Sequence, residues 1–206
     1  EYAYVSDTDA TAFTEWMNVN RQAYANFNDA NVAVSTMTED QKTLANAAMR
    51  NVHFRRAVMF SIDRATMVAQ RKGEDLKYNS MINAYVPGNF VYLSKEVTVD
   101  INGESVTFPA GTAYGTIRQR QLEADGSTMK TFDEETGLGT GFDGWYNPEV
   151  AVAELNTAIE ELKAQGYDIS AENPVYLDIA SFTGNDSFKN QDQALKQSVE
   201  SVLGGV

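Results

Sequence analysis

The 206-residue sequence contains no cysteine, a single histidine and only four prolines. Without cysteine, these residues cannot form disulfides, a catalytic thiolate or a cysteine-based metal site. Because His53 is the only histidine, a multi-histidine metal site is impossible, and a Ser-His-Asp triad would have to use it. His53 stands at the start of an expected helix, so we interpret it as a surface or boundary residue rather than a catalytic one. The lack of cysteine and the single histidine weigh against a hydrolase.

Basic residues are also scarce, with 16 Lys and Arg against 29 Asp and Glu and a net charge of −13. Such a chain is a poor ligand for nucleic acid or an anionic membrane surface, which bind clustered Lys and Arg. No apolar run approaches the roughly 18–20 residues of a membrane span, and no leader or lipidation motif is present. The hydrophobic fraction of 43% is enough for a folded core. We expect a monomeric part of a longer, exported protein.

Helix signals recur along the chain. Thr38 and Gln41 match a capping box, and an apolar stripe at helical spacing runs from Phe54 through Val58 to Ile62. Asp63 is a candidate N-cap for a second short helix that Gly73 would close. The sequence therefore predicts helices at residues 41–50, 54–62, 64–70, 111–123, 148–165 and 191–203.

Strand signals are fewer. Val97–Ile101 and Glu104–Phe108 flank an Asn-Gly pair, which predicts a β-hairpin. Residues 12–19 and 175–179 are predicted to be strands from their aromatic content and their alternating pattern. Together these elements predict one α+β domain over residues 1–206, with a mixed sheet and packed helices.

Residues 125–144 are acidic and rich in glycine, and we expect a long surface loop there. Its acidic side chains, Asp133, Glu134, Glu135 and Asp143, do not match the ligand spacing of a calcium loop. The glycines at 137, 139 and 141 lack the strand and helix of a phosphate-binding fingerprint. We therefore predict no metal site, no cofactor and no catalytic residue, and leave cation binding by residues 133–143 open.

Residues 54–64 (FRRAVMFSIDR) resemble the central signature of extracellular solute-binding proteins of peptide ABC transporters, the oligopeptide and dipeptide-binding family. Three further segments agree in order. Residues 15–18 (EWMN) stand where the family has a strand ending in Phe-Asn, and residues 146–155 (YNPEVAVAEL) resemble the family's Tyr-x-Pro-Glu helix with one extra residue. An extended strand and a helix ending in Leu-Gly follow.

The resemblance implies a contiguous segment of the second lobe of a two-lobed, periplasmic-binding-protein-like receptor. Residues 90–145, with a hairpin and a long acidic loop, resemble an insertion found in oligopeptide-binding lipoproteins of Gram-positive bacteria. The implied function is capture of oligopeptides and delivery to an ABC transporter permease. The implied location is the extracellular membrane face, through a lipid anchor outside this segment, or the periplasm.

Other ligands on the same scaffold remain open: a signalling peptide, a nickel chelate or an oligosaccharide. A surface interaction or adhesion module is the alternative from another class, and a hydrolase is the least favoured.

Residues 13–18 are the candidate ligand-binding segment. Alternation in a strand places Thr14, Trp16 and Asn18 on one face and Met17 on the other. In the family Met17 takes an apolar slot, so its face is expected to be the core face. We therefore predict that Trp16, Thr14 and Asn18 contact peptide, with Phe13 at the strand entry as a weaker member.

Overall fold

The structure is a computed structural model that describes residues 17, 37–78, 81–139, 141–179 and 184–204. Two compact units are present. The described part of unit 1 is Asp63–Trp145, and unit 2 comprises the described parts of Thr14–Ile62 and Tyr146–Val206. Unit 1 thus interrupts the sequence of unit 2.

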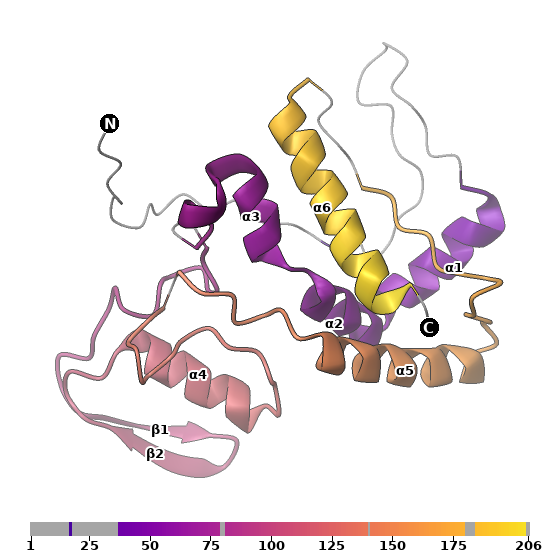
Figure 1. The fold of residues 1–206 in the computed structure, drawn as a ribbon. Helices are drawn as coiled ribbons and strands as arrows, with labels where there is room; N and C mark the ends of the chain where they lie inside the picture. The colour runs from indigo at the N-terminus through magenta and orange to yellow at the C-terminus, as the bar shows by residue number, and fades with distance from the viewer. Residues whose placement is uncertain (1–16, 18–36, 79–80, 140, 180–183, 205–206) are drawn as a thin grey trace, which may run out of the picture. The chain divides into compact units, whose positions relative to one another are not determined.

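The first described helices of unit 2 are α1 (Glu39–Arg50) and α2 (Val52–Ser61), shown in Figure 1. The predicted capping box of α1 is present, with Thr38 and Gln41 each bonding the other's backbone N–H. Asn51 then serves two helices. It is the C-cap of α1, and its side-chain oxygen accepts the Phe54 N–H at 3.0 Å as N-cap of α2.

The other helices of unit 2 in the described residues are α5 (Pro148–Ala164) and α6 (Asp186–Leu203). Asn147 caps α5 with proline at the first helical position, and Gly166 follows it at φ 91°, as predicted. α6 begins five residues before the predicted start, because Asn185 accepts the Ser187 N–H at 2.8 Å.

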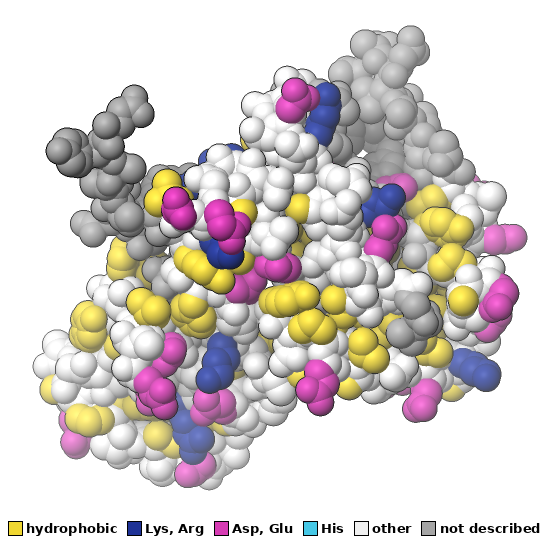
Figure 2. Space-filling view, in the orientation of Figure 1, with side chains coloured by type: hydrophobic (Ala, Val, Ile, Leu, Met, Phe, Trp, Pro, Cys, Tyr) yellow, Lys and Arg dark blue, Asp and Glu magenta, His cyan; other side chains and the backbone are white. Residues whose placement is uncertain are grey.

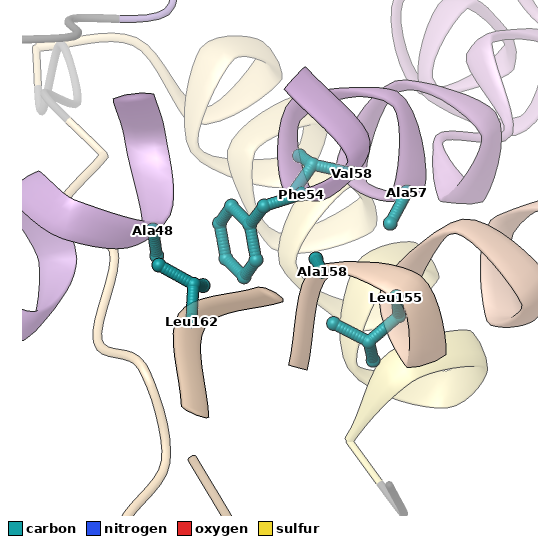
Figure 3. Close-up of a cluster of buried hydrophobic side chains, with 7 residues drawn as sticks. All are labelled: Ala48, Phe54, Ala57, Val58, Leu155, Ala158 and Leu162. Carbon is teal, nitrogen blue, oxygen red and sulfur yellow. The ribbon is translucent and has the colours of Figure 1, made fainter. Parts of the chain in front are cut away.

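The core of unit 2 lies between α1, α2 and α5. Figure 3 shows the Phe54 ring among side chains from all three helices. Three of the core residues are alanines with no exposed area, and such short side chains let the helix backbones approach closely. The buried cluster consists of Ala48, Phe54, Ala57, Val58, Leu155, Ala158 and Leu162.

The C-terminal end of α2 is held by side chains and backbone from α5 and α6. The Asn147 N–H donates to the Phe60 carbonyl at 2.8 Å, and the Ser198 hydroxyl donates to the Ser61 carbonyl at 2.7 Å. These bonds satisfy carbonyls that a helix end leaves without an intrahelical partner. They also fix where the chain leaves unit 2 and where it returns.

Unit 1 contains α3 (Arg64–Lys72), a 3₁₀ turn η1 (Glu74–Leu76), the strands β1 (Val97–Ile101) and β2 (Glu104–Phe108), and α4 (Tyr114–Ala124). β1 and β2 form the predicted antiparallel hairpin, with positive φ at Asn102 and Gly103. Asp63 caps α3 by accepting the Thr66 N–H at 2.9 Å, and Gly73 ends it at φ 83°.

The architecture of the described residues is α+β, with six α-helices and this one two-stranded sheet. The predicted mixed sheet is wrong for these residues. Residues 175–179 form no strand, and only Val175 packs against the core of unit 2. A strand needs a neighbour to pair its backbone groups, and no described strand pairs with this segment. The predicted strand at residues 12–19 lies outside the described residues apart from Met17.

The prediction of a surface loop at residues 125–144 is also partly wrong, because Thr131 and Phe132 are buried in unit 1. In the part of the chain that the structure describes, no helix has the length and apolar character needed to cross a membrane.

We expect Phe54→Ala to lower the free energy of unfolding by about 3–5 kcal/mol, because it leaves a cavity between α1, α2 and α5. Val52→Ala is the matched control, since Val52 opens the same helix and is 44% exposed. Its effect should stay within about 0.5 kcal/mol. Chemical denaturation followed by circular dichroism measures both, and an unchanged midpoint for Phe54→Ala would show that this ring is not a core residue.

Candidate functional site

The predicted ligand residues Phe13, Thr14, Trp16 and Asn18 lie outside the described residues. Their neighbour Met17 is described. It is half-buried and packs against the core cluster of unit 2, as predicted from its position in the apolar slot. Met17 thus gives the one structural reference point for the candidate segment.

A surface hollow of about 340 Å³ lies beside Met17 and is lined by α2. Val52 and Met59 give it an apolar wall, and Arg55 and Arg56 stand at the same hollow. Both arginines already have structural partners. Arg55 Nη1 donates to the Met49 carbonyl at 2.6 Å, and Arg56 Nη1 lies 3.8 Å from Glu154 Oε1. The hollow is therefore a depression between scaffold side chains.

His53 joins α2 to α5. Its Nδ1 lies 2.6 Å from Glu154 Oε2, and its Nε2 lies 3.7 Å from Glu161 Oε1. The Asn51 side-chain amide also donates to Glu161 at 2.7 Å. His53 is thus a half-buried residue at the helix boundary, in agreement with its interpretation from sequence. The carboxylates on α5 could not be found from sequence, because they lie about a hundred positions away.

Arg64, the last residue of the signature, lies in unit 1. Its guanidinium donates to the Asn83 side chain, to the Ile82 carbonyl at 3.3 Å and to Asp143 at 3.2 Å. It also lies over the Trp145 ring, 5.7 Å from the centroid. Burial lowers the pKa of Arg64, and the Asp143 carboxylate opposes this shift. Arg64 is thus the centre of a polar cluster in unit 1.

The Arg64 cluster fastens residues 141–145 to residues 81–83. Asn83 is buried and donates from its side chain to the Phe142 carbonyl at 3.0 Å, and the Gly141 N–H donates to the Met81 carbonyl at 3.0 Å. Asp143 has only 10% of its side chain exposed. The interpretation of Asp143 as a residue of a solvent-exposed loop is wrong, because its side chain is mostly buried against Arg64. The sequence could not reveal this pair, since the two residues lie 79 positions apart.

The other acidic residues of this loop behave as expected from sequence. Glu134 and Glu135 are exposed. Asp133 accepts the N–H groups of Glu135 and Thr136, and its hydrogen bonding with Thr136 lowers the pKa of the Asp133 carboxyl. Figure 2 shows acidic and basic side chains spread over the face in view. Within the described ranges, no three His, Asp or Glu side chains converge as metal ligands would.

Comparison with known proteins supports the resemblance that the signature suggested. The chain is similar, along nearly its whole length, to curated proteins named for binding oligopeptides. The resemblance predicted from sequence is thereby confirmed. No family model matches the chain.

Three relatives illustrate the match. The oligopeptide-binding protein AmiA of Streptococcus pneumoniae is 29% identical over 188 residues, which cover 91% of this chain and 24% of that protein. SarA of Streptococcus gordonii is 27% identical and AliA of Streptococcus pneumoniae 26%, each over 196 residues, 95% of this chain and 25% of the relative. The chain thus spans about a quarter of the length of these relatives.

We expect Arg64→Ala to loosen residues 141–145, because it removes the donors that join them to residues 81–83. Loss of a buried, charge-assisted contact of this kind costs about 1–3 kcal/mol. Hydrogen exchange should therefore speed up at the Gly141 amide, by about tenfold or more. Lys72→Ala, an exposed change at the end of the same helix, is the control and should leave this amide unchanged. Equal exchange in Arg64→Ala and the parent would contradict the anchoring role.

Proposed function

We propose that this chain is a segment of an extracellular binding protein that captures oligopeptides and delivers them to an ABC importer. The observation that carries the proposal is the similarity to oligopeptide-binding proteins over 91–95% of the chain. The relatives are named as binding proteins, which favours peptide capture over catalysis and over a surface interaction module.

Within such a receptor we place the chain in the second of two lobes. Residues 175–179 support its being part of a larger fold. Tyr176, Leu177 and Ile179 are 47%, 38% and 43% exposed, and the segment has no strand partner among the described residues. A strand from outside this chain could pair with its backbone and cover its apolar side chains.

In this proposal the two lobes close about a hinge on an extended peptide, and the ligand shifts the equilibrium toward the closed form. Main-chain hydrogen bonds hold the peptide, as in strand addition, and water in the side-chain pockets keeps selectivity loose. The permease then receives the peptide from the closed form. The protein works at the extracellular membrane face, through a lipid anchor outside this chain, or in the periplasm.

We propose the segment around Trp16 as the contribution of this chain to the ligand cleft. Met17 supports the assignment, because it packs against the core of unit 2. Neighbouring side chains in an extended segment point to opposite faces, so Trp16 and Asn18 would point away from that core. Thr14 shares this face, and Phe13 stands at its entry.

Calorimetric titration of the full-length protein with hexaalanine and with a randomised hexapeptide mixture tests the function. We expect heat of binding with at least the mixture, because loose selectivity admits many side chains. No binding of either probe, with the protein folded by circular dichroism, would overturn oligopeptide capture.

With a binding peptide in hand, Trp16→Ala should weaken affinity by about 1–3 kcal/mol, roughly 5- to 150-fold, and leave the melting temperature nearly unchanged. Met17→Ala, its neighbour on the opposite face, is the matched control. It should lower the melting temperature with little effect on the affinity of the folded protein. The reverse pattern would identify Trp16 as a core residue and remove it from the site.

A further inference from the structure

Five large apolar side chains are exposed within eight residues of unit 1. Tyr85 is 94% exposed, Phe90 52% and Tyr92 57%, and Val86 and Val91 lie between them at 37% and 54%. We refer to these five residues as the aromatic strip. Exposed apolar residues scattered singly need no explanation, but a concentration of this kind marks an interaction surface.

The strip is uncharged in a chain that is otherwise rich in charge. Residues 81–94 contain no Asp, Glu, Lys, Arg or His, although charged residues make up 22% of the sequence. The tyrosine hydroxyls and Asn89 are among its few polar groups. A surface that captures peptides needs groups for peptide main chain and termini, whereas a permanent protein interface is apolar and depleted in charge at its centre. The composition therefore favours a permanent interface.

The backbone beneath the strip is fixed. Gly88 and Pro87 are buried, and a Cβ built on Gly88 would lie 2.8 Å from the Gly115 Cα and 2.5 Å from the Phe132 ring. Only glycine allows this approach. The Gly115 N–H also donates to the Gly88 carbonyl at 2.9 Å.

Backbone hydrogen bonds also hold the C-terminal end of the strip. The Tyr114 N–H donates to the Val91 carbonyl at 2.8 Å, and the Leu93 N–H donates to the Thr112 carbonyl at 2.9 Å. The strip cannot turn inward without breaking these bonds. A pre-ordered surface loses little conformational entropy when a partner covers it.

We propose that the aromatic strip is an intramolecular docking surface that packs against an apolar, uncharged face of the same polypeptide outside these 206 residues. The inference rests on the proposed membership of a longer receptor. Relatives about four times as long supply the chain needed, since this chain matches only 24–25% of each. Residues 175–179 of unit 2 are an independent second case of neighbouring apolar side chains that are exposed.

Hydroxyl-radical footprinting read by mass spectrometry tests the proposal at Tyr85, Phe90 and Tyr92. It compares the 206-residue chain with the full-length protein, without peptide and with the randomised hexapeptide mixture. Because labelling follows side-chain exposure, covering these rings should lower their labelling by about fivefold or more in the full-length protein, with or without peptide. Phe54, a core residue, reports in each sample that unit 2 is folded.

Each other outcome overturns the docking proposal. Strong labelling in the full-length protein means that the aromatic strip stays exposed to solvent. Protection that appears only with peptide assigns the strip to the ligand. Weak labelling of the 206-residue chain means that the chain itself or a second copy covers it, and sedimentation separates these two. The calorimetric result for peptide binding is independent of all of them.

A paired substitution gives a second readout. Phe90→Ser with Tyr92→Ser should lower the melting temperature of the full-length protein by several degrees and leave that of the 206-residue chain nearly unchanged. Val99→Ser on β1 is the control, because Val99 is exposed and apolar in the same unit but lies outside the strip. Equal shifts in the two proteins would overturn the docking role.

Discussion

The close approach of α1, α2 and α5 is the constraint on which unit 2 depends. Ala48, Ala57 and Ala158 have no exposed area, and at the close helix spacing that they allow, the larger buried side chains, the Phe54 ring among them, fill the remaining space. The same spacing brings the α5 carboxylates within reach of His53. The family signature therefore has a physical explanation in this structure: its apolar residues encode the packing of one helix against its neighbours.

The sequence predicted the parts of the fold that short-range rules control. Caps such as Thr38, Asp63 and Asn147 act within three residues, and the Asn-Gly hairpin is set by two residues, so a local pattern was sufficient. Prediction from sequence failed where the interacting residues lie far apart along the chain. The prediction of a surface loop missed the burial of Asp143, because its arginine lies 79 residues earlier, and residues 175–179 were assigned to a sheet although no described strand pairs with them.

In the candidate ligand segment, too, the short-range relation was predicted and the long-range one was not. The position of Met17 in the core agrees with prediction, because a single apolar slot beside a signature helix is a local relation. The role of the residues on either side of Met17 is proposed and not predicted by a local pattern, since in the proposed receptor the ligand cleft includes residues outside these 206. In the proposed receptor, unit 2 supplies a rigid support for ligand contacts, and the signature shapes that support.

The two ends of the segment formed by residues 63–145 lie close together. Arg64 and Asp143 form an ion pair near its first and last residues, and in unit 2 the Phe60 carbonyl and the Asn147 N–H are bonded on the two sides of the interruption. A segment whose ends meet in this way can be lengthened, shortened or replaced by a short turn without moving the helices that flank it. Residues 63–145 could therefore be exchanged for another domain while the α2–α5 scaffold keeps its geometry.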